Sequence, residues 1–128
     1  MESDLRRWMT LVETGARSPA HQLIRQFYRA VANPKYASIF AHIDVDLEEQ
    51  DSDMVTILNI HAKKQQRGIG SAVMKSICAL ADTYHVYLEL QVKPSGIPYD
   101  KLVEWYKRFR FSPDAASHGK WMVREWTR

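Results

Sequence analysis

The segment 54–92 constrains the fold more than any other part of the sequence. Residues 54–61 and 85–92 alternate apolar and polar side chains as strands do, and residues 69–84 between them carry apolar side chains at helical spacing. A strand, a helix and a second strand in this order form a parallel pair joined by a right-handed crossover. The segment therefore predicts a sheet with parallel strands and a helix packed on it.

Hydrophobic periodicity predicts further elements on both sides of this unit. They are helices at residues 4–13 and 19–32, a strand that begins at residue 38, an acidic hairpin turn at 48–53, a helix at 99–109 and a last strand at 120–126. The strand before the acidic turn is expected to pair antiparallel with the strand at 54–61. With 128 residues, 45% of them hydrophobic, the chain suits one packed domain. We expect an α+β fold with a mixed sheet, in which residues 1–34 are helical and residues 38–126 contain the sheet.

Composition excludes several classes of protein. The formal net charge is +3, and the basic residues do not form the long stripe with interleaved aromatic residues that is typical of a nucleic-acid surface. One cysteine, Cys78, cannot form an internal disulfide, and its helical position beside apolar residues predicts a core role. The chain lacks a signal-like leader and an apolar run of about 20 residues, so we expect a cytoplasmic protein that does not contact membranes. The histidine spacing predicts no metal site.

A glycine-containing loop joins the first strand of the unit to its helix. It runs Ala62-Lys63-Lys64-Gln65-Gln66-Arg67-Gly68-Ile69-Gly70-Ser71. A helix N-terminus offers unpaired amides and the positive end of the helix dipole, and glycines let the backbone approach an anion closely. Such an arrangement suits a pyrophosphate group. A tight strand-to-helix turn without a ligand is the alternative interpretation.

Other phosphate-binding loops do not match this segment. A Walker A loop has a lysine after its last glycine, but Ser71 follows Gly70 here. A dinucleotide-binding loop has a third glycine, and Val73 stands at that position. A protein-kinase loop belongs to a much longer chain.

The stretch 60–75 resembles the signature motif of the GNAT superfamily of N-acetyltransferases, which runs Gln/Arg-x-x-Gly-x-Gly/Ala after the central strand. Gln65, Gly68 and Gly70 occupy its three defining places. The resemblance implies a single three-layer domain with the acyl-CoA N-acyltransferase fold and acetyl-CoA as cofactor. It implies that main-chain groups before the loop pair with the pantetheine arm and that loop amides hold the pyrophosphate. The implied cofactor-binding residues are Ile60, His61, Ala62, Gln65, Gln66, Arg67, Gly68, Ile69, Gly70 and Ser71.

A second motif follows at the distance that the family shows. The run Trp105-Tyr106-Lys107-Arg108-Phe109-Arg110-Phe111 resembles the family's helix end, usually aromatic-Tyr-x-x-x-Gly-Phe. Tyr106 falls on the tyrosine that in many members protonates the departing coenzyme A thiolate, a role that suits a weak acid with a pKa near ~10. Packing as an ordinary helix aromatic is the alternative for Tyr106. Arg110 stands where the family often has glycine, and Tyr99 stands where it often has asparagine.

Several polar residues on the predicted strands are candidates for the base that removes the proton of the acceptor amine. They are His42, Asp44, Asp46, Asn59, His61, Glu89 and Gln91. We select Glu89 and His61, with Tyr106, as the catalytic candidates. The carboxylates at 44, 46 and 89 would suit a cationic amine.

The sequence therefore predicts an acetyl-CoA-dependent N-acetyltransferase that transfers acetyl groups directly to a primary amine of a small molecule, a protein lysine or a protein N-terminus. The alternative is a catalytically weak protein-binding module with the same fold. A nucleic-acid binder is a third, less favoured interpretation. Trp121 and Trp126 would suit a homodimer contact.

Overall fold

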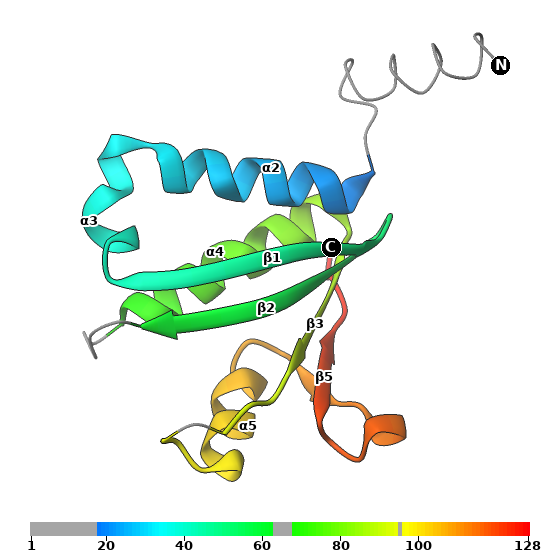
Figure 1. Ribbon diagram of the computed structural model, residues 1–128. Coiled ribbons are helices and arrows are strands. Elements are labelled where there is room, and N and C mark those ends of the chain that lie inside the picture. Colours follow the sequence, from blue (N-terminus) through cyan, green and yellow to red (C-terminus); the bar gives the residue numbers. More distant parts are fainter. Residues whose placement is uncertain (1–17, 63–67, 95) are drawn as a thin grey trace, which may run out of the picture.

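The computed structural model of the protein describes residues 18–62, 68–94 and 96–128. It is an α+β domain with a five-stranded mixed sheet in the order β1-β2-β3-β5-β4 (Figure 1). The α-helices are α2 (Pro19–Ala32), α3 (Ala37–Phe40), α4 (Ile69–Tyr84) and α5 (Tyr99–Lys107). The strands are β1 (Ile43–Asp51), β2 (Met54–Ala62), β3 (Tyr87–Gln91), β4 (Ser112–Pro113) and β5 (Trp121–Arg124), and two 3-10 turns are η1 (Pro34–Tyr36) and η2 (Ala115–Ser117). The predicted α+β class with a mixed sheet is confirmed.

Helix α2 begins and ends where the sequence predicts. The Ser18 hydroxyl accepts a hydrogen bond from the backbone N–H of His21 at 3.1 Å, and proline occupies the first helical position. Asn33 and Pro34 end the helix. The helix predicted at residues 4–13 lies outside the described residues. In the parts of the chain that the structure describes, none of the helices is long and apolar enough to span a membrane.

The strand predicted to begin at residue 38 begins at Ile43 instead. Residues Ala37–Phe40 form helix α3, since the 3-10 turn after Asn33 continues in a helical conformation and Phe40 packs edge-on against Phe27 with ring centroids 5.8 Å apart. The apolar alternation around Ile39 therefore marks a half-buried face of a short helix and not a strand.

The predicted acidic turn at 48–53 is also shorter than expected. Strand β1 continues to Asp51, and β2 begins at Met54, so the turn itself is formed by Ser52 and Asp53. Strand β1 is an edge strand of the sheet. Exposed carboxylates are well tolerated on an edge strand because they face solvent and discourage pairing with other chains.

The predicted strand-helix-strand unit is confirmed, with one shortened strand. Strands β2 and β3 are parallel, from the pair Met54 and Tyr87 to the pair Ile57 and Leu90, and β1 runs antiparallel to β2. Helix α4 has the predicted bounds. Strand β3 does not begin at His85, because that residue has a left-handed φ of 57° and ends α4.

A β-bulge interrupts the pairing of β1 with β2 at Leu58. Asp46 pairs with Asn59 and Leu47 pairs with Ile57, so Leu58 has no partner on β1, and its side chain is 45% exposed. The parallel ladder with β3 ends at Ile57, immediately before the bulge. Beyond this point the described part of β2 pairs with β1 alone, and β2 and β3 diverge (Figure 1).

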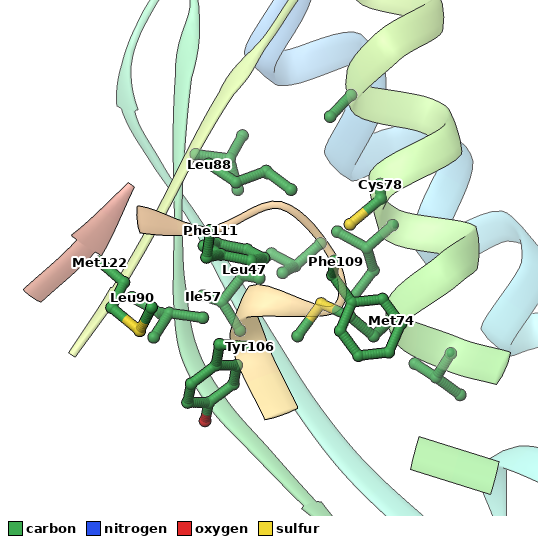
Figure 2. Close-up of a cluster of buried hydrophobic side chains, with 14 of the residues drawn as sticks. Leu47, Ile57, Met74, Cys78, Leu88, Leu90, Tyr106, Phe109, Phe111 and Met122 are labelled. Carbon is green, nitrogen blue, oxygen red and sulfur yellow. The ribbon is translucent and has the colours of Figure 1, made fainter. Parts of the chain in front are cut away.

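The apolar core lies between the helices and the sheet. Helices α2 and α4 pack on each other and contact β1, β2 and β3. Aromatic residues from α5 and the turn after it complete the cluster, together with side chains from α4, β3 and β5 (Figure 2). The labelled members are Leu47, Ile57, Met74, Cys78, Leu88, Leu90, Tyr106, Phe109, Phe111 and Met122. These contacts fix the end of α5 against the start of the diverging strands.

A buried arginine joins three segments at the edge of this core. Arg124 on β5 is 4% exposed, and its guanidinium donates two hydrogen bonds of 3.0 Å to Asp82 on α4 and one of 2.8 Å to the carbonyl oxygen of Phe109. Asp82 also accepts a hydrogen bond from the backbone N–H of Thr127. Burial raises the pKa of Asp82, but the hydrogen bonds from Arg124 and Thr127 outweigh this effect and lower it overall.

We expect Asp82→Asn to lower the free energy of unfolding by about 2–4 kcal/mol, because it leaves a buried guanidinium without a counter-ion. The lowered pKa of Asp82 means that its stabilisation is present above the usual aspartate pKa of about 3.9 and is lost as the pH falls below that value. Urea unfolding from pH 7 to pH 3 measures both effects, with the exposed Glu104→Gln as control. A stability difference that does not shrink at low pH would contradict this account.

Candidate functional site

The start of α4 is organised by Gly68. This residue has φ 92° and ψ −12°, a left-handed conformation that favours glycine, and its carbonyl oxygen accepts the first helical hydrogen bond from Ala72 at 2.9 Å. The amides of Ile69, Gly70 and Ser71 in the first turn therefore have no partner within the helix. They form the positive end of a helix of 16 residues, which is favourable for an anion.

Gly70 has a different role from Gly68. It has a helical conformation, and a Cβ atom added to it would lie 3.7 Å from Cζ2 of Trp105 on α5. The start of α4 therefore lies beside the C-terminal part of α5. The second glycine of the first sequence motif and the tryptophan that begins the second motif are neighbours in the structure.

The remaining predicted cofactor residues are only partly described. Gln65, Gln66 and Arg67 lie outside the described residues. Ile60 is half-buried and pairs with Val45 of β1, and Ala62 ends β2 opposite Ile43. These two positions lie in the part of β2 that has lost β3 as a neighbour.

Tyr106 on α5 is part of the apolar core. Its ring is 7% exposed and belongs to the same cluster as Ile57 and Leu90, the last pair of the parallel ladder. Figure 2 shows its hydroxyl oxygen pointing away from the apolar side chains. None of the residues that the structure describes forms a hydrogen bond with this hydroxyl. Burial raises the pKa of Tyr106, so the phenol is protonated at neutral pH and can act as a proton donor.

Glu89 and His61 lie on the other face of the sheet from the Tyr106 ring. Glu89 pairs with Thr56 in the parallel ladder, and its carboxylate accepts a 2.6 Å hydrogen bond from the Thr56 hydroxyl. His61 is exposed and pairs with Asp44 of β1. This outer face also carries Asp46, so acidic groups and the two predicted base candidates share one surface. The structure does not bring either base candidate next to the predicted acid.

The bulge at Leu58 was not predicted from the sequence. The signal was present, because the apolar positions 55, 57 and 60 shift by one from strict alternation.

Arg110 was identified only as a departure from the family pattern. It nevertheless adopts the left-handed conformation, with φ 73°, that glycine adopts most easily. Tyr99, the other departure, donates a 2.8 Å hydrogen bond to the carbonyl oxygen of Gly119.

The structure gives little support to other chemistries in the described residues. Cys78 is buried, and burial raises the pKa of its thiol to about 11, so it is not an activated nucleophile. Within residues 18–62, 68–94 and 96–128, no cluster of three histidine, cysteine or acidic side chains is placed to hold a metal ion.

Comparison with known proteins adds a fold relationship. No protein-family model matches the chain. No curated protein matches it in sequence. Among solved structures, the chain is similar to the anti-CRISPR protein AcrVA5, with a TM-score of 0.57 and 22% sequence identity over 68% of this chain and 92% of that chain. A likeness at this level of identity shows a shared fold.

The two glycines should respond differently to substitution. Gly68→Ala should lower the free energy of unfolding by about 1–2 kcal/mol, because an alanine at φ 92° is strained although the space around it is open. Gly70→Ala should be neutral or stabilise the protein by about 0.5 kcal/mol, because alanine suits a helix and its methyl group makes an ordinary contact with Trp105. Chemical denaturation of both variants measures this difference, and equal losses at the two positions would contradict it.

Proposed function

We propose that the protein is an acetyl-CoA-dependent N-acetyltransferase of the GNAT type, which acts on a primary amine. The observation that carries the proposal is the edge of β2 that β3 leaves after Ile57, together with the Tyr106 hydroxyl, for which the described residues provide no hydrogen-bond partner. The structure describes no partner for this hydroxyl and no neighbouring strand for this edge of β2, so both are available to a ligand. An extended molecule with amide and phosphate groups would satisfy both.

The residues present fit such a cofactor. The open edge of β2, including Ile60 and Ala62, offers backbone groups to an extended arm that contains amides. The amides of the first turn of α4 suit a pyrophosphate. Acetyl-CoA supplies an activated thioester. In this proposal, Tyr106 holds a proton on its hydroxyl oxygen and donates it to the departing sulfur.

The outer face of the sheet is where we propose that the acceptor amine approaches. It carries Glu89, His61 and the exposed carboxylate of Asp46, which favour a cationic amine over a neutral or anionic acceptor. Glu89 and His61 are the groups on this face that would take the proton of the ammonium, either directly or through water. The amine would reach the thioester at the edge of β2 that β3 leaves after Ile57.

The folded protein should bind acetyl-CoA. We expect a saturable heat of binding and, at saturating ligand, a melting temperature raised by about 5 °C. Isothermal titration calorimetry and differential scanning fluorimetry measure these quantities. The absence of binding to a folded protein would refute the proposal. Binding without acetyl transfer to any member of an amine and peptide panel would favour the protein-binding module instead.

The substitution Tyr106→Phe should lower turnover by roughly 100-fold with little change in cofactor affinity, because it removes a proton donor but preserves the packed ring. The release of free thiol from acetyl-CoA in the presence of an acceptor amine reports turnover. Tyr84→Phe, a half-buried tyrosine at the end of α4, is the matched control. An unchanged rate for Tyr106→Phe would exclude this residue from the mechanism.

A further inference from the structure

A groove of about 480 Å³ runs along α4 towards the segment that follows α5. It begins at Ser71 in the first turn of α4 and continues past Lys75 and Ala79. Its opposite wall is formed by Arg108, Phe109 and Arg110. From Ser71 to Ala79 the helix advances about 12 Å, at 1.5 Å per residue. The groove therefore leads away from the turn of α4 that suits a pyrophosphate and has room for a further group.

The groove carries an excess of positive charge. Lys75, Arg108 and Arg110 are exposed, and none of them forms an ion pair with an acidic residue in the described ranges. The acidic residue in the groove, Asp82, accepts two hydrogen bonds from Arg124, whose positive charge balances its negative charge. The groove thus presents three positive charges without a compensating negative charge, which favours a phosphate-bearing ligand.

Arg110 has a backbone conformation that is unfavourable for any residue with a side chain. Its φ of 73° lies in the left-handed region, where glycine is unstrained and a larger residue is not. The guanidinium is held at the rim of the groove by a 2.9 Å hydrogen bond from its Nη1 to the hydroxyl of Thr127. Arg124 holds the neighbouring carbonyl oxygen of Phe109, and in this conformation Arg110 lines the groove.

We propose that this groove binds the 3′-phosphorylated adenosine end of coenzyme A, with Lys75, Arg108 and Arg110 on the 3′-phosphate. The inference rests on the proposed function and deepens it, since it adds a contact that distinguishes coenzyme A from cofactors that lack this phosphate. The apolar surfaces of Ala79 and Phe109 give the adenine ring a place between the charged residues. The groove is continuous with the start of α4, so one molecule can reach both.

The direct test compares coenzyme A with dephospho-coenzyme A, which lacks only the 3′-phosphate, by calorimetry on the full chain. We expect coenzyme A to bind at least about tenfold more tightly, as loss of charge-assisted hydrogen bonds predicts. Equal affinities for the two ligands would overturn the inference while leaving the proposed function intact.

The substitution Arg110→Gly separates the ligand contact from the fold. It relieves the strained φ, so the protein should remain folded, while the affinity for coenzyme A falls about tenfold and the affinity for dephospho-coenzyme A stays unchanged. Lys107→Ala removes a neighbouring charge on α5 that does not line the groove, and it is the matched control. Lys75→Ala, an exposed position, gives the same comparison if Arg110→Gly is poorly folded. Equal losses for both ligands, or no loss, would overturn the assignment.

A third ligand distinguishes failure of this inference from failure of the proposed function. If neither form of coenzyme A binds, the proposed function fails. Adenosine 3′,5′-bisphosphate then probes the groove by itself. Binding that Arg110→Gly weakens would preserve the groove as a phosphorylated-nucleotide site, and no binding would overturn it.

Discussion

The interrupted pairing of β2 is the constraint on which the rest of the structure depends. A strand in the middle of a sheet normally satisfies its backbone on both sides, but the extra residue at Leu58 changes the register with β1 just where the ladder with β3 ends. Past Ile57 the two parallel strands no longer pair. The core cluster that contains Ile57 and Leu90 also contains Tyr106 and Phe111, which pack edge-on with 6.0 Å between ring centroids.

Arg124 on β5 connects the C-terminal strands of the sheet to the rest of the domain. Its guanidinium connects α4, the turn after α5 and strand β5, so the short strands β4 and β5 are held to a helix and not only to β3. The same arrangement positions Arg110, which lies one residue after the carbonyl that Arg124 binds. The conformation of this turn is therefore determined by tertiary contacts and not by the residue at its left-handed position. This explains how an arginine can occupy a place where glycine would be easier to accommodate.

The features that could be predicted from the sequence are those set by local residue patterns and by the preferred handedness of strand crossovers. Helix α4, helix α2 and the parallel pairing of β2 with β3 follow from apolar spacing, capping residues and the right-handed crossover, all of which are local or general. Helix α3 was missed because its alternation resembles a strand, and the contact of Phe40 with Phe27 decides otherwise. The pair of Asp82 with Arg124 joins residues that are 42 positions apart, which no local pattern reveals. For the site, Tyr106 and the glycines were identified from motifs, whereas the groove depends on α4 and the end of α5 meeting in space.

The shared fold with an anti-CRISPR protein does not by itself assign a reaction, because one fold can carry many functions. The proposed assignment rests on three features of the described residues. They are a tyrosine hydroxyl without a described partner, a groove lined by basic side chains, and an edge of β2 that has no neighbouring strand after Ile57. Each of them offers polar or charged groups with which a ligand could interact. The groove reaches Ser71 in the first turn of α4, and Gly70 in the same turn lies beside Trp105, the neighbour of Tyr106 in sequence. The proposed cofactor, with a phosphorylated nucleotide at one end and a thioester at the other, would explain all three features with one ligand, whereas a protein that binds only another protein would need a separate explanation for each.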